Sequence, residues 1–151
     1  MKGRGLLLAE VEERVAERLP SAVRFTPGRR LVVRALARGE GPVSAGELYE
    51  EVRRQVPLSS LYRTLTVLAD VGVLERHHDA DGLARFELGE WLLGHHHHLV
   101  CVECGRVQDV EVDDGVEDRV AQIASGIAAG GGYTVTGHRV DVEGVCEPCR
   151  V

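Results

Sequence analysis

The spacing of apolar residues predicts helices in the first half of the chain. From Leu6 to Leu19 they recur every three or four positions, as on one face of an amphipathic helix. Another helix is expected to begin at Thr26-Pro27, because threonine caps helices and proline suits their first position. A further helix is expected after Ser44-Ala45-Gly46-Glu47, which has the spacing of a capping box.

One more helix and a hairpin complete the pattern of this half. Pro57 forces a break, and Ser59 or Ser60 is expected to cap a helix over residues 61–69. Two strand-like runs with a turn between them follow at residues 73–77, 79–82 and 83–88. Helices followed by a hairpin are typical of a winged helix-turn-helix, whose last helix enters the major groove and whose hairpin is the wing.

The second half predicts a separate α/β domain. A stretch rich in Gly and Leu, residues 88–94, is interpreted as a hinge. Strands, a helix, a loop and a last pair of strands are then expected at 99–102, 106–112, 116–128, 130–132 and 133–145. The predicted fold class is α+β: an N-terminal winged helix (1–88), a hinge (89–94) and a C-terminal α/β domain (95–151).

Composition and charge restrict the class of protein. The 151 residues are 44% hydrophobic but only 4% aromatic, so the core is expected to consist mainly of Leu, Val and Ala. No membrane span or signal peptide is visible, which favours a cytoplasmic protein with no membrane partner. The net charge of −6 divides into +3 over residues 1–74 and −9 over the remainder. The first half can therefore face phosphates, while the second offers carboxylates to cations.

The strongest chemical signal is a pair of CxxC motifs. Two such pairs can supply four thiolates to a tetrahedral structural zinc, through Cys101, Cys104, Cys146 and Cys149. A closed shell of this kind leaves no position for catalysis, and its binding energy, on the order of 10 kcal/mol, is folding energy. The alternative is four buried free cysteines or two redox pairs.

Four consecutive histidines precede the first CxxC motif. Alternate residues of a strand face opposite sides, so His95 and His97 are expected to serve one metal site and His96 and His98 another. The remaining ligands can come from the acidic part of the chain after residue 74, which offers Glu87, Glu90, Asp109, Glu111, Glu117 and also His138. The alternative is a solvated polar strand.

The predicted groove-entering helix carries groups suited to DNA. Ser59, Ser60, Tyr62 and Arg63 offer hydroxyls and a guanidinium at its N-terminal end. Arg24, Arg29 and Arg30 are expected on the DNA backbone. Alternatively, Tyr62 belongs to the core and Arg63 is a surface charge.

Taken together, these motifs resemble the ferric uptake regulator family over nearly the whole chain. The similar segments are 24–29, 44–49, 60–65, 76–82, 95–105 and 144–149. The resemblance implies a homodimer that binds a palindromic double-stranded operator when loaded with a regulatory divalent metal. No enzymatic activity and no small-molecule substrate are expected.

The resemblance also assigns the metal ligands. The four cysteines match the structural zinc site, and a second site in the dimerisation domain matches His95, His97, Glu117 and His138. The sensing site matches His96, His98 and Glu90, with either Glu75 or His77 as the remaining ligand. Asp109 matches a carboxylate position of iron and peroxide sensors.

The identity of the regulatory metal stays open. Iron and peroxide sensors often place a histidine where this chain has Pro42, which favours Zn(II) over Fe(II), with nickel, manganese and peroxide sensing as further alternatives. The chain also departs from the family at Ser60-Leu61 and by an apparent insertion at 130–132.

Metal binding is expected to act by holding the domains in one arrangement about the hinge, and to weaken below about pH 6.5 as histidines protonate. A metalloenzyme or a metal buffer would be the alternative class.

Overall fold

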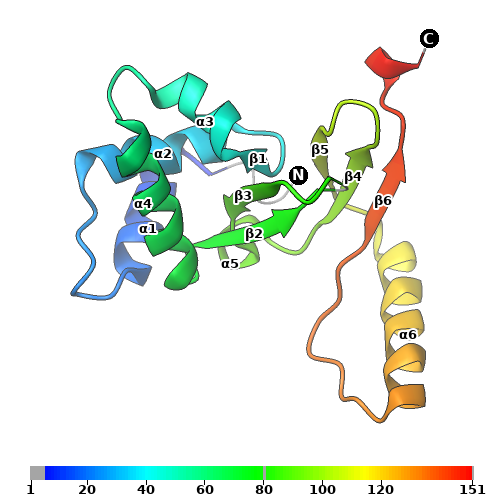
Figure 1. Cartoon of the computed structure of the whole chain (residues 1–151). Helices are drawn as coiled ribbons and strands as arrows, with labels where there is room; N and C mark the ends of the chain where they lie inside the picture. Colours follow the sequence, from blue (N-terminus) through cyan, green and yellow to red (C-terminus); the bar gives the residue numbers. More distant parts are fainter. Residues whose placement is uncertain (1–5, 80, 151) are drawn as a thin grey trace.

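The first half of the chain folds around a three-stranded sheet in the computed structural model, which describes residues 6–79 and 81–150. Residues 1–5, Ala80 of the expected turn and residue 151 lie outside the described residues. Helices α1 to α4 pack beside a sheet of strand order β1-β3-β2 (Figure 1). Their bounds are α1 Leu8–Arg18, α2 Pro27–Arg38, β1 Val43–Ser44, α3 Ala45–Val52, α4 Leu58–Asp70, β2 Leu74–His78 and β3 Ala84–Leu88.

Two of the expected helix starts are confirmed by their caps. The Thr26 hydroxyl accepts a hydrogen bond from the backbone N–H of Arg29, with Pro27 in the first turn of α2. In α3 the capping box closes in both directions: Ser44 Oγ accepts from Glu47 N at 3.2 Å, and Glu47 Oε2 accepts from Ser44 N at 2.7 Å. These local bonds satisfy N–H groups that a helix leaves unpaired at its start.

The start of α4 differs from the prediction. Pro57 is the N-cap residue and the helix begins at Leu58, so neither Ser59 nor Ser60 caps it. Pro57 has the extended backbone of a helix entry, with its φ fixed by the ring, and no side chain caps the helix. Both serines therefore lie exposed in the first turn.

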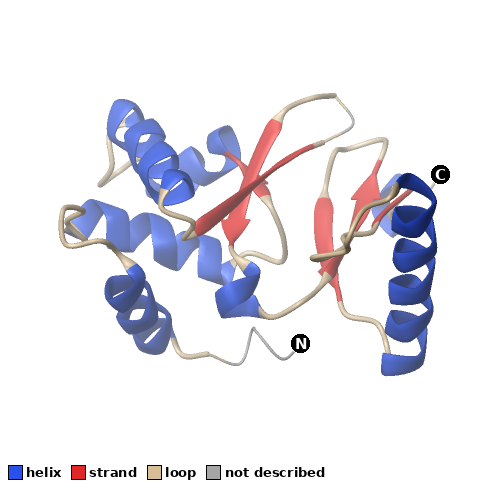
Figure 2. Cartoon of the chain, turned by 90° about the horizontal axis from the view of Figure 1, so that it is seen from below, coloured by secondary structure: helices blue, strands red, loops and turns tan. Residues whose placement is uncertain are grey.

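Strand β3 is buried on both faces, which positions the functional site. Phe86 and Leu88 point into a core of Leu and Val side chains, including Leu61, Leu65 and Leu68. Side chains alternate along a strand, so Arg85 and Glu87 face the other way. They are nevertheless only 5% and 3% exposed. Figure 2 shows why: the second half of the chain lies on the side opposite the helices.

The predicted hinge contains a short helix, α5 (Glu90–Leu93). Leu92 is 4% exposed and belongs to the core of the first half. The chain leaves this helix at Gly94, whose φ of +83° lies in the region that glycine adopts without strain. The turning point between the halves is thus Gly94 rather than the whole stretch.

The second half forms another three-stranded sheet, of order β5-β4-β6. Its elements are β4 His97–Cys101, β5 Val107–Val110, α6 Asp114–Gly131, β6 Asp141–Gly144 and a 3-10 turn, η1, at Glu147–Cys149. Strand β4 pairs antiparallel with β5 and parallel with β6.

Two expectations for this half are wrong. Helix α6 continues through Gly130 and Gly131, expected as a loop, and ends at left-handed Gly132. Of the two strands expected within 133–145, the described residues contain only β6. In addition, no helix in the described part is long and apolar enough to cross a membrane.

Candidate metal centres

The four cysteines converge at one end of the second sheet. The parallel pairing of β4 with β6 places Cys101 opposite Gly144, which brings the C-terminal CxxC motif onto the first one. All four Sγ atoms lie within 4.8 Å of one another, and those of Cys104 and Cys146 are 3.8 Å apart. A tetrahedral zinc with Zn–S bonds of about 2.3 Å separates its sulfurs by about 3.8 Å. The geometry therefore fits zinc.

The thiols are electrostatically unequal without a cation. Backbone N–H groups of Cys146 and Cys104 lower the pKa of Cys101 to about 6. The neighbouring thiols of Cys146 and Cys104 raise the pKa of Cys149 to about 12. One thiolate thus suppresses ionisation of the others, and a divalent cation would remove this repulsion.

A second cluster joins the two halves of the molecule. Glu87 comes from β3 of the first sheet, whereas His98 on β4, Asp109 on β5 and His96 just before β4 come from the second half, with candidate ligand atoms within 4.8 Å of one another. Glu87 Oε2 lies 3.2 Å from His96 Nε2, and its Oε1 lies 3.1 Å from His98 Nε2. Asp109, the register partner of His98, places Oδ1 3.9 and 3.7 Å from these nitrogens.

His96 and His98 both direct Nε2 toward the cluster. Nδ1 of His96 lies 2.9 Å from the carbonyl oxygen of Gly94, and Nδ1 of His98 lies 3.0 Å from Asp141 Oδ1. Both partners are acceptors, so each Nδ1 carries a hydrogen, and Nε2 is the nitrogen that would bind a metal ion once it has lost its own proton. This arrangement is typical of metal-ligating histidines.

Without metal, protons substitute for the cation. Hydrogen bonding to Glu87 raises the pKa of His96 to about 9. Burial alone would lower the pKa of His98, but Glu87 and Asp141 raise it. Burial would likewise raise the pKa of Glu87, yet hydrogen bonds from the surrounding histidines hold it far below its ordinary value.

A third cluster lies on the opposite side of the histidine run. It contains His95, His97, Glu117 and His138. Glu117, in the first turn of α6, is 2.9 Å from His97 Nε2, 3.3 Å from His95 Nε2 and 2.6 Å from His138 Nε2. Hydrogen bonding to His97 lowers the pKa of Glu117. The expected alternation of the four histidines is thus present in the structure.

Glu90 does not lie where it was expected. Its Oε1 is 3.1 Å from His95 Nδ1, so it borders the third cluster instead of joining His96 and His98. Glu87 occupies the place expected for it. The sequence holds a signal for this position of Glu87. Because Glu87 lies between the core residues Phe86 and Leu88 on a strand, its side chain is expected on the face opposite the core.

Glu75 and His77, alternative ligands in the sequence analysis, both lie near Glu87. His77 Nε2 is 2.5 Å from Glu87 Oε1 and 3.9 Å from Glu75 Oε2. Glu75 also accepts a hydrogen bond from the backbone N–H of Glu90 at 3.0 Å. Pro42 is fully buried and offers no ligand atom.

The predicted DNA-facing residues are on the surface. Ser59, Ser60, Tyr62 and Arg63 are exposed on α4, and Tyr62, 54% exposed, is not a core residue. Arg24 is exposed, and its carbonyl accepts a 2.6 Å hydrogen bond from Arg29 Nη1.

Residues 20–143 match the model of the ferric uptake regulator family. The chain is 33% identical to the ferric uptake regulation protein of Bacillus subtilis over 135 residues, 86% of this chain and 87% of that protein. It is 28% identical to the peroxide-responsive repressor PerR of Staphylococcus epidermidis over 144 residues, 93% and 91% of the two. A solved zinc uptake regulator complexed with zinc and DNA is similar with a TM-score of 0.60 and 27% identity, covering 97% of this chain and 94% of that one.

This protein is therefore a transcription regulator of the type that binds DNA and metal. It belongs to the ferric uptake regulator family.

Proposed function

We propose that this protein is a homodimeric repressor that binds a palindromic operator when one divalent ion is held by Glu87, His96, His98 and Asp109. The observation that supports this most is the origin of these ligands, because Glu87 belongs to the wing hairpin and the other three to the second half of the chain. An ion at this cluster would tie the DNA-binding half to the second half. On this view residues 1–88 form the DNA-binding domain and 95–151 the metal-binding and dimerisation domain.

Outside this cluster the two halves also touch around Glu40 and Gly41. The backbone N–H of Asp109 donates to the carbonyl of Glu40 at 3.0 Å, and Arg106 pairs with the Glu40 carboxylate at 2.7 Å. Gly41 lies so close that an added Cβ would stand 2.6 Å from the Val107 carbonyl oxygen. A coupling of about 1–3 kcal/mol, usual in allostery, would change operator affinity roughly 5- to 150-fold.

The ligand set supports Fe(II) as the first candidate for the regulatory metal. It offers two imidazole nitrogens and two carboxylates, with no thiolate, and two histidines plus carboxylate suit non-haem Fe(II). Relatives with the printed names ferric uptake regulation protein and PerR are consistent with this choice. Four protein ligands also suit tetrahedral Zn(II), which the sequence had favoured and which we keep as the second candidate.

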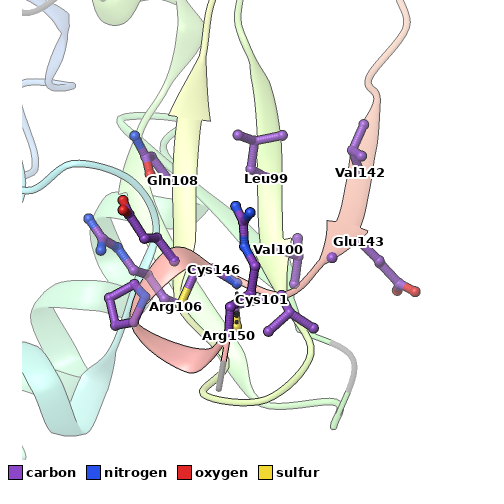
Figure 3. A pocket seen from close by; sticks show the side chains of 13 residues that line it. Leu99, Val100, Cys101, Arg106, Gln108, Val142, Glu143, Cys146 and Arg150 are labelled. Atoms are coloured by element: carbon purple, nitrogen blue, oxygen red, sulfur yellow. Dashed lines mark hydrogen bonds between the residues drawn. The ribbon is translucent and has the colours of Figure 1, made fainter.

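An uncovered apolar surface supports the homodimer. Helix α6 has no buried residue, and its stripe of apolar side chains includes Ile123 and Ile127, 63% and 74% exposed. Leu99 on β4 and its register partner Val142 on β6 are also exposed, beside a hollow of about 430 Å³ next to the cysteine cluster (Figure 3). A second copy would cover both surfaces, since large apolar patches mark interfaces.

The dimer would present two copies of α4 to DNA. Ser59, Ser60, Tyr62 and Arg63 would contact base edges and phosphates, with Arg24 and Arg29 on the backbone. Because its operator is chromosomal DNA, we expect the protein to act in the cytoplasm.

Operator binding titrated with buffered free Fe(II), Zn(II), Mn(II) and Ni(II) tests this function, with the structural zinc retained. One metal should switch DNA binding on within its cellular range. Metal binding without any change in DNA affinity would instead support a metal buffer and contradict the proposal. An operator-independent hydrolytic activity at the cluster would support the metalloenzyme alternative.

A further inference from the structure

Arg85, on the middle strand of the first sheet, is a buried arginine outside the three metal centres. Its side chain is only 6% exposed. Its Nε donates to Asp79 Oδ2 at 3.1 Å, and its Nη1 donates to Glu47 Oε2 at 2.9 Å. Burying a charged group is costly unless it is paired, and here one guanidinium pairs with two carboxylates. These carboxylates come from two different parts of the DNA-binding half.

Asp79 shapes the turn of the wing hairpin. Its Oδ1 accepts from the backbone N–H groups of Asp81 and Leu83, at 3.1 and 2.9 Å, while its Oδ2 accepts from Arg85. Its side chain is 5% exposed. Burial alone would raise the pKa of Asp79, but these donors hold it below its ordinary value. The charged carboxylate therefore fixes the turn against the middle strand.

Glu47 holds the start of α3. The same Oε2 that accepts from Arg85 also accepts from the backbone N–H of Ser44 at 2.7 Å, within the capping box. Ser44 is in turn the register partner of Arg85 where β1 pairs with β3. Helix α3 packs against α4, the helix that carries the predicted DNA contacts. Arg85 therefore connects the wing turn with this pair of helices.

The cysteine turn of the second half lies against this arginine. A Cβ added to Gly105 would stand 3.2 Å from Arg85 Nη2 and 3.9 Å from Asp79 Oδ2. Gly105 has a φ of +72°, which glycine adopts without strain, and its N–H donates to the Cys101 carbonyl at 2.9 Å. It directly follows Cys104, an expected ligand of the structural zinc. The turn that zinc would hold thus packs on the pair formed by Arg85 and Asp79.

We propose that Arg85 is a positioning residue for DNA binding, which holds the wing turn and the start of α3 in one arrangement when the cysteine turn packs on it. Structural zinc then acts on the DNA-binding half through Gly105 and Arg85, besides folding its own domain. The proposal rests on the proposed DNA-binding role of the wing and α4, and not on the sensing cluster.

The chemistry of arginine suits this role. Buried ion pairs add little stability compared with apolar side chains, and in some proteins they specify one arrangement instead. The rigid fork of donors on Arg85 holds both carboxylates from fixed directions. The ammonium of a lysine, by contrast, is a point charge on a flexible stem. Lysine would therefore keep the charge and lose the arrangement.

Amide hydrogen exchange with and without zinc tests the coupling, because exchange reports local opening. Removal of zinc by a chelator should speed exchange of the Leu83 N–H, which Asp79 accepts, and of the Ser44 N–H, which Glu47 accepts. Each should exchange roughly 10-fold faster, as expected when a hydrogen bond to a charged group is weakened. The Arg30 N–H at the start of α2 should keep its rate. Unchanged rates at Leu83 and Ser44 would overturn the proposal.

Arg85→Lys separates the fork from the charge. With zinc bound, the Leu83 and Ser44 amides of this variant should exchange as fast as those of the zinc-free wild-type protein, and zinc removal should add nothing. Arg76→Lys, which changes an exposed arginine of the neighbouring strand β2, is the matched control and should behave as wild type. Slow exchange in Arg85→Lys with the full response to zinc would show that charge alone suffices, and the proposal would be wrong.

Glu47→Gln supplies the same test at a side chain that is 54% exposed, in case Arg85→Lys does not fold. Glutamine keeps an acceptor for the Ser44 N–H and removes the charge that pairs with Arg85. The Ser44 amide should then lose its response to zinc, while the Leu83 amide keeps it. A Ser44 amide that still responds would contradict the link through Arg85.

Operator affinity supplies the functional readout. With zinc and the regulatory metal saturating, Arg85→Lys should bind the operator at least about 5-fold more weakly than Arg76→Lys, the lower end of usual coupling between sites. Equal affinities would overturn the positioning role even if the regulatory metal still switches DNA binding on. If Arg85→Lys behaves as expected but wild-type affinity ignores the regulatory metal, the sensing proposal fails and the role of Arg85 stands.

Discussion

His98 Nε2 lies 3.1 Å from Glu87 Oε1, although the two residues belong to different sheets. Both side chains are almost completely buried, at 3% and 4% exposure. Burying a charged group is costly unless it is paired or binds a cation. The arrangement of the two halves therefore depends on the proton or metal ion that compensates the charge of Glu87.

The double substitution His96→Ala/His98→Ala should abolish metal-dependent operator binding and leave the fold intact. Both side chains border the space between the sheets, and neither belongs to the hydrophobic core. DNA mobility shifts with and without regulatory metal measure the effect, and far-UV circular dichroism checks the fold. The control is His78→Ala, which removes an exposed histidine of wing strand β2. This variant should bind the operator with the normal response to metal. A double variant that still responds would exclude this cluster as the sensing site.

Glu90→Gln should affect the third cluster and spare the sensing cluster. Its Oε1 lies 3.1 Å from His95 Nδ1, and His95 Nε2 lies 3.3 Å from Glu117 Oε1, so Glu90 would act on the third cluster as an outer partner of His95. Removal of such an outer partner usually costs 10- to 100-fold in metal affinity. Isothermal titration with Zn(II) should show a weaker second site and an unchanged sensing site. Unchanged affinity at the second site together with a weaker sensing site would restore the original assignment of Glu90.

Metal binding at the sensing cluster should strengthen from pH 7 to pH 9. The pKa of His96 is raised to about 9 by Glu87, so its proton stabilises the metal-free arrangement fully below about pH 6.5, and this contribution is lost as pH rises through about 9. A metal ion competes with that proton for the same nitrogen. Affinity measured by chelator competition should rise by up to about tenfold per pH unit for the one proton released. A metal affinity that no longer rises above pH 7 would contradict this assignment. So would an affinity that stops rising near pH 6.5, as expected for a histidine with an ordinary pKa.

Loss of one cysteine should unfold the second half selectively. Cys104→Ser removes a ligand from a cluster that holds the C-terminal CxxC motif against β4, and structural zinc supplies on the order of 10 kcal/mol of folding energy. The first half keeps its own core of Leu and Val. Amide NMR should show dispersed signals for residues before Gly94 and collapsed signals after it. A variant that keeps both sets dispersed would indicate that zinc is not required for this domain to fold.

Ile127→Asp should weaken the dimer. Ile127 is 74% exposed within one chain, and a charge there would have to be buried at the expected interface. Sedimentation analysis should show a shift from dimer to monomer, whereas Arg119→Asp, another exposed position of α6, should remain dimeric. An unchanged dimer in Ile127→Asp would place the interface elsewhere.

The sequence predicted those features that depend on local rules. The caps at Thr26 and Ser44 and the strand alternation of the histidines follow from short-range hydrogen bonds and backbone geometry. The convergence of the two CxxC motifs followed from the chemistry of four thiols.

The sequence did not predict features that depend on contacts between the halves. Glu90 shortly precedes the histidine run in the chain, but α5 packs onto the first core, and the Glu90 carboxylate lies beside His95. Glu87 enters the cluster because β3 is covered on its second face by another sheet, which no local pattern specifies. For the same reason, the contact of Arg85 with Gly105 was visible only in three dimensions, since it joins the two halves.

The most direct test is operator affinity of the wild-type protein and of Glu87→Gln, each with the regulatory metal saturating and then removed by a chelator. Glutamine keeps the size of the side chain but removes the charge that joins the wing to His96 and His98. The wild-type protein should bind its operator roughly 5- to 150-fold more tightly with metal, and Glu87→Gln should bind equally weakly in both conditions. A variant with the full metal response would contradict the claim that the ion acts by joining the two halves at Glu87.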